Sequence, residues 1–275
     1  MGSEVMLGQP LGGALGGPLG LRPAVGGRAA APTIQMLLVG AGGAGGRPFS
    51  FQTWGPPGGG GGQVLELEVN LPLGVYPVVI GLGGNPVSAS AAGGSTTLGA
   101  LFTAIGGGGN PLFSEGTFYE LAPAVGWNAA GNYRPPAPLP LHRGGYPGGL
   151  HFDNGSRRGG GGGGGSGGPG GDATALIGGP AGPGKFSAIS GTPVEYGRGG
   201  PGGHSLAAAG PAIGPGGGGG GGAPGNEATG HPGNPGILII SYETGTQTWL
   251  GGDVTQAGNR TIHTLTADGT LTRTA

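Results

Sequence analysis

The chain contains no cysteine and very little charge. The absence of cysteine excludes disulfide bonds, thiolate metal sites and a cysteine nucleophile. Only 8% of the 275 residues are charged, the net charge is −1, and Lys185 is the single lysine. Binding to nucleic acid requires clustered Lys and Arg, whereas here only Arg157 and Arg158 are adjacent. We therefore expect no nucleic-acid partner.

Long apolar runs are also missing, because glycine and proline interrupt every one of them. No stretch approaches the roughly 18 uninterrupted apolar residues that would span a bilayer. The first thirty residues lack both a basic region and an unbroken apolar core of the kind found in signal peptides. The sequence thus predicts neither a secretory leader nor membrane insertion.

Residue patterns that carry catalysis are scarce. The histidines are His142, His151, His204, His231 and His263. They lie far apart and have no acidic or histidine partner at metal-ligand spacing on a credible helix. Glu66 and Glu68 point the same way on a predicted strand, which a solvated face explains better than an acid/base pair. We expect no catalytic site, no metal and no cofactor, and hence a protein that is not an enzyme.

One stretch, GPAGPGK from Gly179 to Lys185, has the spacing of a phosphate-binding Walker A loop. The next residue is Phe186, where such a loop needs Ser or Thr for Mg²⁺, and two prolines remove amides that would hold phosphate. The match therefore carries no nucleotide-binding prediction.

Glycine fills 78 positions and proline 27, a share usually associated with low-complexity or disordered chains. Disorder normally comes with high net charge and many polar residues, which this chain lacks. The glycine runs recur between short apolar segments instead of forming one serine-rich linker, so order is favoured, with a flexible tether as the alternative.

The apolar segments predict a small antiparallel β scaffold with almost no α-helix. Residues 64–71 alternate apolar and polar side chains with a period of two, which is typical of a half-buried strand. Residues 75–84 are expected to be its partner, with Pro77 marking an edge or a bulge. Further strands are expected at 33–39, 95–98, 100–105 and 237–242.

The last thirty residues are rich in threonine. Asp268 and Gly269 lie between two threonine-rich arms, which predicts a β-hairpin with its turn at these two residues. We accordingly divide the chain into a Gly/Leu/Pro-rich arm at 1–32 for attachment, a glycine-rich β domain at 33–244, and a threonine-rich hairpin segment at 245–275.

Ordering glycine costs more backbone entropy than ordering any other residue. Ordered glycine runs therefore require favourable interactions that offset this cost. One such interaction is the close packing of backbone against backbone. Glycine chains in the polyproline-II conformation have three residues per turn and rise about 3.1 Å per residue. Such helices can lie side by side and form hydrogen bonds on all sides. We therefore expect the glycine-rich loops to pack as polyglycine-II helices held together by the β scaffold.

Residues 110–152 are different in character, since they hold seven aromatic residues among prolines and show no lasting period of two or 3.6. Two interpretations stay open. The aromatics form an exposed binding face, or they fill a small core beneath an irregular cap.

The order of these blocks resembles a known family. The blocks are LLVGAGGAGG, GQVLELEVNLPLGVYPVVIGLGG, GGSTTLGALFTAIGGGG and GGGGGGGAPGNEATGHPGNPGILIISY. Together they look like the glycine-rich domain of tailed-bacteriophage tail and fibre proteins, and the tail GGDVTQAGNRTIHTLTADGTLT is similar to the hairpin that accompanies that domain. The likeness covers residues 33–272; the aromatic insert and the N-terminal arm depart from it.

The resemblance implies a structural virion protein, a tail or tail-fibre component and a candidate receptor-binding tip, made in the cytoplasm of the bacterial host. Its implied partners are other virion proteins, further copies of itself or a fixed site on the particle, and a host surface protein or glycan. Aromatic side chains offer large rigid contact area. The candidate receptor-binding residues are Trp127, Tyr133, Tyr146, Phe118, Tyr119, His142 and His151.

Two alternatives stay open at this point. One is a particle-building role, such as a capsid decoration or neck protein, without receptor binding. The other is an ice-binding or matrix protein made of polyglycine-II helices.

Overall fold

The computed structural model describes seven stretches of the chain. These are residues 33–47, 55–87, 92–109, 145–153, 158–204, 206–223 and 229–275. Within them there is no helix, and all regular structure is β. The expectation of a mainly β protein with almost no helix is therefore confirmed for the described residues. The strands are β1 Ile34–Val39, β2 Val64–Val69, β3 Gly74–Val79, β4 Thr96–Leu98, β5 Phe102–Ala104, β6 Phe152–Asp153, β7 Arg158–Gly159, β8 Lys185–Ser187, β9 Val194–Tyr196, β10 Ile237–Glu243, β11 Trp249–Leu250, β12 Asp253–Ala257, β13 Arg260–Leu265 and β14 Gly269–Arg273.

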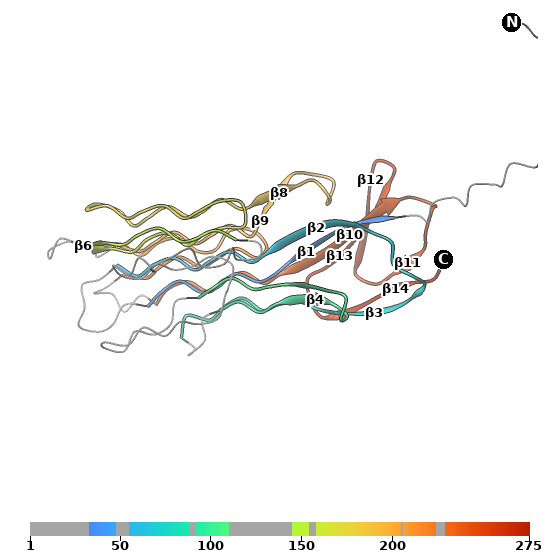
Figure 1. Ribbon diagram of the computed structural model, residues 1–275, viewed down its shortest axis with the longest axis horizontal. Helices are drawn as coiled ribbons and strands as arrows, with labels where there is room; N and C mark the ends of the chain where they lie inside the picture. The colour runs from blue at the N-terminus through green and yellow to red at the C-terminus, as the bar shows by residue number, and fades with distance from the viewer. Residues whose placement is uncertain are drawn as a thin grey trace, which may run out of the picture. The chain divides into compact units, whose positions relative to one another are not determined.

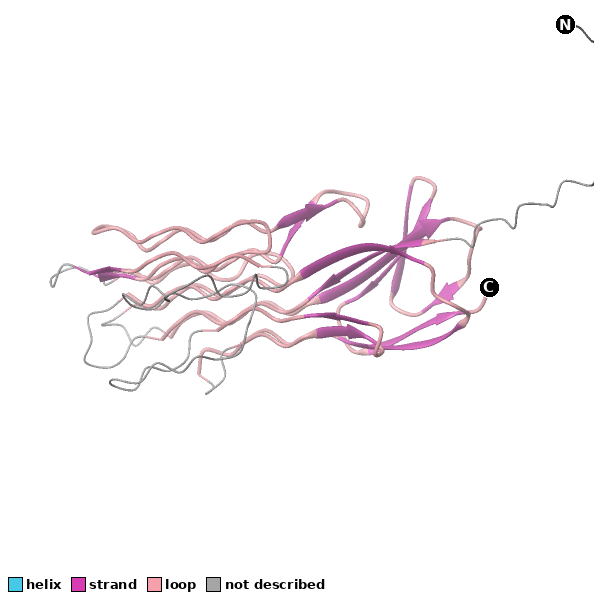
Figure 2. Ribbon diagram, in the orientation of Figure 1, coloured by secondary structure: helices cyan, strands magenta, loops and turns pink. Residues whose placement is uncertain are grey.

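The strands form two five-stranded antiparallel sheets (Figures 1 and 2). The first sheet has the order β12-β13-β10-β1-β2, and the second sheet has the order β11-β14-β3-β4-β5. Two separate hairpins, β6-β7 and β8-β9, complete the set. Residues from both ends of the domain share each sheet, because β1 pairs with β10 and β3 pairs with β14.

The two sheets face each other across the main hydrophobic core. Met36, Leu38 and Ile240 of the first sheet and Leu98 and Leu271 of the second sheet are fully buried in one cluster. Strand side chains alternate between faces, so the neighbouring residues of β1 point to the other side of the first sheet. A β-sandwich results.

A second cluster covers the outer face of the first sheet. Leu37 and Val39 of β1 pack there with Ile189 and Tyr196 from the β8-β9 hairpin. Strand β1 is thus covered on both faces, which explains its nearly continuous apolar sequence. The alternation in 64–71 is also confirmed in outline, because Leu65, Val69 and Leu71 face the core between the sheets.

The predicted pairing of residues 64–71 with residues 75–84 is wrong. Strand β2 is an edge strand of the first sheet and pairs with β1, whereas β3 lies in the second sheet. The chain crosses from one sheet to the other after β2, and the hydroxyl of Tyr76 donates to the carbonyl of Pro72 at 2.5 Å within this corner. Apolar residues on both strands are buried better by facing each other across the core than by pairing.

Pro77 also departs from expectation, because it lies in a central strand between β14 and β4. Its carbonyl accepts a hydrogen bond from Gly99 at 2.7 Å, so this side of Pro77 faces the turn that ends β4. Pro77 has no residue opposite it in β4, because β4 pairs only as far as Val78. The missing amide proton therefore costs no hydrogen bond between the two strands. Proline is tolerated there for the same reason that it is tolerated at an edge.

The predicted hairpin at Asp268 and Gly269 is wrong as well. The strands on either side of this turn, β13 and β14, belong to different sheets. The Asp268 carboxylate accepts the amide of Ile80 at 2.7 Å and so holds the turn against the end of β3. The hairpin in this region is β12-β13 instead, with a two-residue turn at Gly258 and Asn259, where Gly258 has φ 58°.

Candidate functional site: the polyglycine bundle

The glycine-rich segments continue from the ends of the strands and lie side by side (Figure 1). We call them together the polyglycine bundle. Its segments are 40–46, 55–63, 81–85, 92–95, 105–109, 145–151, 159–168, 169–173, 177–184, 197–204, 206–213, 215–223 and 229–236.

Hydrogen bonding in the bundle repeats every three residues. In segment 40–46, one row of amides donates to 55–63 at 2.9 Å and a second row donates to 229–236 at 2.9 and 3.0 Å. A third amide donates to 92–95 at 3.0 Å. The first row consists of Gly40, Gly43 and Gly46, and the second row consists of Gly42 and Gly45. The third amide is that of Ala41. A period of three with bonds only to other segments defines a polyglycine-II helix.

The carbonyl groups of segment 40–46 accept bonds from three more segments, 81–85, 105–109 and 215–223. This segment is therefore bonded to six neighbours, three through its amides and three through its carbonyls. Backbone groups are satisfied by other backbone, and very little side chain is needed. The expected packing of the glycine runs is confirmed.

Close approach of backbones makes glycine necessary. A Cβ at Gly42 would lie 1.9 Å from the carbonyl oxygen of Gly217, and a Cβ at Gly45 would lie 2.0 Å from that of Gly220. Both obstacles are backbone atoms, which cannot rotate away. The packing that orders the glycine runs is thus available only to residues without a side chain at these positions.

The bundle tolerates both chain directions. Segment 55–63 bonds to 159–168 in the parallel direction, because Gly58 and Gly61 donate to Gly161 and Gly164. The same segment bonds to others in the antiparallel direction. A three-residue helix presents donors and acceptors to all sides in either direction, so the chain can run outward and return repeatedly within one lattice.

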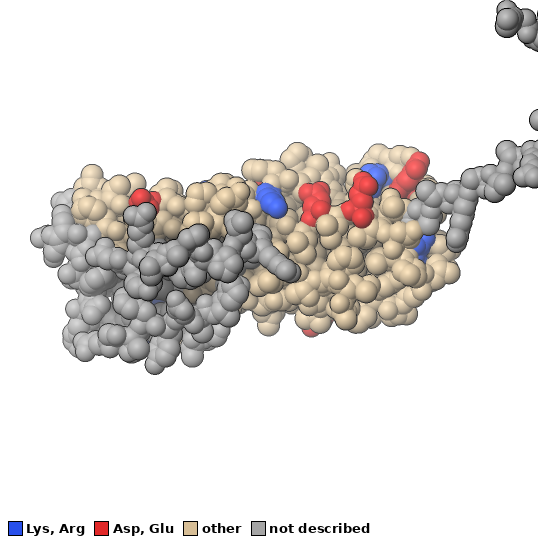
Figure 3. Space-filling view, viewed as in Figure 1, with Lys and Arg blue, Asp and Glu red and all other residues tan. Residues whose placement is uncertain are grey.

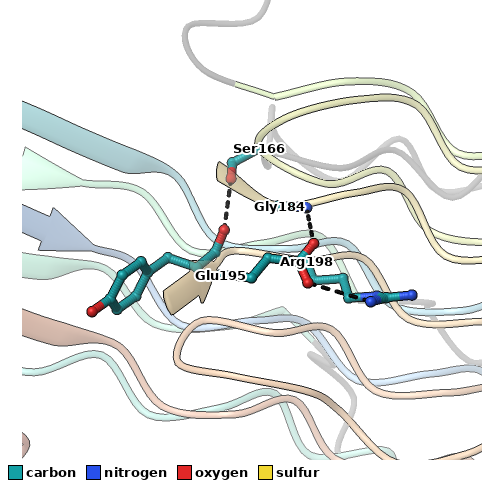
Figure 4. A network of polar contacts seen from close by, with 5 residues as sticks. Ser166, Gly184, Glu195 and Arg198 are labelled. Atoms are coloured by element: carbon teal, nitrogen blue, oxygen red, sulfur yellow. Dashed lines mark hydrogen bonds and ion pairs between the residues drawn. The ribbon is translucent and has the colours of Figure 1, made fainter. Parts of the chain in front are cut away.

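Side chains join the β8-β9 hairpin to the bundle (Figure 4). The hydroxyl of Ser166 donates to the carbonyl of Tyr196 at 3.0 Å, and the amide of Gly184 donates to Glu195 Oε1 at 2.7 Å. Arg198 Nη1 forms an ion pair with the other carboxylate oxygen of Glu195 at 3.3 Å. One carboxylate therefore links three segments of the chain.

Buried polar side chains in the sandwich are structural. His263 is 1% exposed, and its Nδ1 lies 2.7 Å from the carbonyl of Gly251. A carbonyl only accepts, so Nδ1 carries the proton and Nε2 accepts from the Tyr242 hydroxyl at 3.0 Å. Burial raises the pKa of Tyr242. Both ring nitrogens of His263 thus have hydrogen-bond partners within the sandwich.

One face of the molecule shows how charge is distributed on it. Figure 3 shows acidic and basic side chains mainly over the sheet portion of the molecule, whereas much of the described bundle surface in this view is uncharged. Among the described residues, no three His, Asp or Glu side chains come together as a metal site would require. In the same part of the chain, no helix has the length and apolar character to span a bilayer.

The sequence-predicted contact residues are only partly described. Trp127, Tyr133, Phe118, Tyr119 and His142 lie outside the described residues. The other two candidates belong to segment 145–151 of the bundle. They are Tyr146, which is 46% exposed, and His151, which is partly buried.

Sequence reasoning missed the residues that join the parts. Glu195 and Arg198 follow each other at an ordinary spacing, and no local pattern marks them as a junction. The buried pair of Tyr242 and His263 comes from two strands that meet only in the first sheet. The alternation of the strands predicts that these side chains are inward, but not that they touch.

Comparison with known families gives one match, because the model for the Glycine-rich domain aligns with residues 24–243. The chain belongs to this family. The match takes in the polyglycine bundle and strands β1 to β10, whereas β11 to β14 lie beyond it. No curated protein and no solved structure matched the sequence. The glycine-rich domain of this chain is thus completed by four strands that follow the family match.

Proposed function

We propose that this glycine-rich domain protein is a structural component of a tailed-bacteriophage tail or tail fibre. The observation that carries the proposal is the six-neighbour packing of segment 40–46. A lattice in which the backbone bonds on all sides forms a rigid support without a large core. Loops that bind a surface need such a support, because their own sequences contribute little structure. The order of strand and glycine blocks supports the phage assignment.

The contact region in this proposal is the aromatic insert. In the sequence, residues 110–144 lie between segments 105–109 and 145–151, which both belong to the bundle. Tyr146 lies at one of these ends and is 46% exposed. Trp127 and Tyr133 add further aromatic contact area for sugar rings or protein surfaces.

The first test is to locate the chain in an electron-microscopy map of the purified particle. Particles are then prepared with Trp127→Ala, Tyr133→Ala and Tyr146→Ala combined. We expect normal incorporation of the variant and at least a tenfold loss of adsorption to host cells. A purified particle without the chain would overturn the virion role, and unchanged adsorption would overturn the receptor-binding role.

A second candidate function, particle building without receptor binding, is favoured by the outer face of the second sheet. Val75, Val79 and Leu250 are 66%, 48% and 57% exposed there, and the strands of this sheet contain one charged residue, Arg273. Arg273 donates to the carbonyl of Leu71, so its charged group is held by the chain itself. Exposed uncharged surface of this kind is typical of protein contacts.

A second experiment tests this docking face. Val75→Glu combined with Val79→Glu is expected to prevent incorporation if this face docks on the particle, because a contact would bury two unpaired charges. Val254→Glu is the matched control, since Val254 is 57% exposed on β12 of the first sheet. Equal incorporation of both variants would remove the docking face from consideration.

A further inference from the structure

Each helix of the bundle has three rows of amides, because residues three apart share a face. A helix inside the lattice uses all three rows, as segment 40–46 does. A helix at the edge uses only some of them, and the remaining row faces outward. In several edge segments the outward row consists of proline.

Segment 229–236 illustrates this pattern. Its His231 and Asn234 amides donate to 215–223 at 2.8 Å, and Gly233 and Gly236 donate to 81–85 at 3.0 and 2.9 Å. These bonds use two of the three rows. The third row consists of Pro232 and Pro235, which are exposed and have no amide proton.

Segment 177–184 shows the same pattern. Gly179 and Gly182 donate inward to 159–168 at 2.8 and 2.9 Å. The adjacent row consists of Pro180 and Pro183, both exposed. Their carbonyls still accept bonds from Gly171 at 2.8 Å and Gly167 at 2.9 Å. The prolines therefore belong to the lattice as acceptors and offer no donor to its surroundings.

Several other edge positions carry a proline or a carboxylate cap. Exposed Pro147 and Pro169 and half-buried Pro201 stand in rows of segments 145–151, 169–173 and 197–204. Carboxylates cap two further amides, since Leu150 donates to Asp172 at 2.7 Å and Gly184 donates to Glu195 at 2.7 Å (Figure 4).

An open row of amides at the edge of such a lattice resembles the free edge of a β-sheet. It offers regularly spaced donors to any chain of the same geometry, and a second copy of this protein has that geometry. Each new hydrogen bond contributes little, but a row shared between copies adds several. Proline removes the donors and places a ring where a neighbouring backbone would approach.

We propose that the proline rows Pro180/Pro183 and Pro232/Pro235 terminate the polyglycine lattice and prevent lateral association of bundles from different copies of the chain. This role is independent of any phage function. Proline also restricts φ and so stabilises an extended helix through the unfolded state. The two effects differ in their readout, because loss of restriction lowers stability, whereas loss of termination raises the mass of the particle in solution.

The test replaces each row in the full chain, as Pro180→Gly with Pro183→Gly and as Pro232→Gly with Pro235→Gly. Glycine restores the donors and removes the ring. Sedimentation and light scattering over a hundredfold concentration range are expected to show at least a doubling of weight-average mass relative to the parent chain. Hydrogen exchange should show slowed amides at the new glycines in the associated form.

The matched control is Pro72→Gly with Pro193→Gly, since these exposed prolines lie in turns outside the bundle. It should keep the mass of the parent chain. Alanine at Pro180 and Pro183 is the second variant, because it restores the donors at a lower entropic cost and decides the matter if the glycine variant unfolds. Edge variants that stay folded at the parent mass, or a control that associates equally, would overturn the proposal.

Discussion

Replacing Gly42 with alanine tests whether backbone contact holds the bundle together. The new Cβ would lie 1.9 Å from the carbonyl oxygen of Gly217, 2.3 Å from its carbon and 2.7 Å from the amide nitrogen of Gly218. All three distances are below the 3.0 Å that real Cβ contacts respect, and all three atoms belong to backbone. The helices 40–46 and 215–223 must therefore move apart.

The cost can be worked out from the bonds around the site. Separation stretches the two bonds between these helices, from Gly219 to Gly43 at 2.9 Å and from Gly222 to Gly46 at 3.0 Å, and the shift of Gly42 strains its bond to Asn234 at 2.9 Å. Three bonds of about 0.5–1.5 kcal/mol each give a loss of about 1.5–4.5 kcal/mol. Overpacking in protein cores costs a similar amount, about 1–3 kcal/mol. The melting temperature should fall by roughly 5–15 °C.

Gly210→Ala is the matched control, because a Cβ at Gly210 meets nothing within 4 Å. Alanine there is expected to be neutral or to stabilise by about 0.4–1 kcal/mol through the unfolded state. Urea unfolding followed by circular dichroism, together with calorimetry, measures both variants. If Gly42→Ala and Gly210→Ala have equal stability within about 0.5 kcal/mol, close backbone packing is not what orders the glycine runs.

Two further predictions concern buried tyrosines. Tyr242→Phe removes the donor to His263 and leaves a buried acceptor unpaired, so urea unfolding should show a loss of about 1–3 kcal/mol; an effect no larger than that of Tyr76→Phe at an exposed corner would contradict this. Burial raises the pKa of Tyr196 and of Tyr242 above the ordinary 10.0, so folding retains their protons. This contribution to stability is complete below pH 10 and is lost as the pH rises above it. Calorimetry should show melting temperatures that decline in this alkaline range, with a shallower decline when both tyrosines are Phe, and an unchanged slope would count against it.

Local patterns predict the elements of this fold better than their partners. The period of two in 64–71 identified a strand with Leu65 and Val69 on the inner face, as the core shows. The same pattern could not place β3 in the opposite sheet, because a strand alternates in the same way whichever partner it has. The turn at Asp268 likewise has hairpin residues, but the carboxylate is held by Ile80, which is distant in the sequence.

The candidate site follows the same division. Long glycine runs between strands indicated polyglycine-II packing, because backbone contacts must offset the entropy cost of ordering glycine. The sequence does not show which row of a glycine run faces which neighbour, since every residue in the run is the same. Only prolines three residues apart, such as Pro180 and Pro183, indicate from the sequence which row of the helix faces outward.

The sequence by itself determined that this protein is built from short strands and bare backbone, because composition and period are properties of neighbouring residues. The tertiary structure alone decided which strands share a sheet and which six segments surround 40–46. Backbone hydrogen bonds are chemically alike at every glycine. Their pairing is therefore selected by how the sandwich positions the ends of the segments, and not by any residue within them.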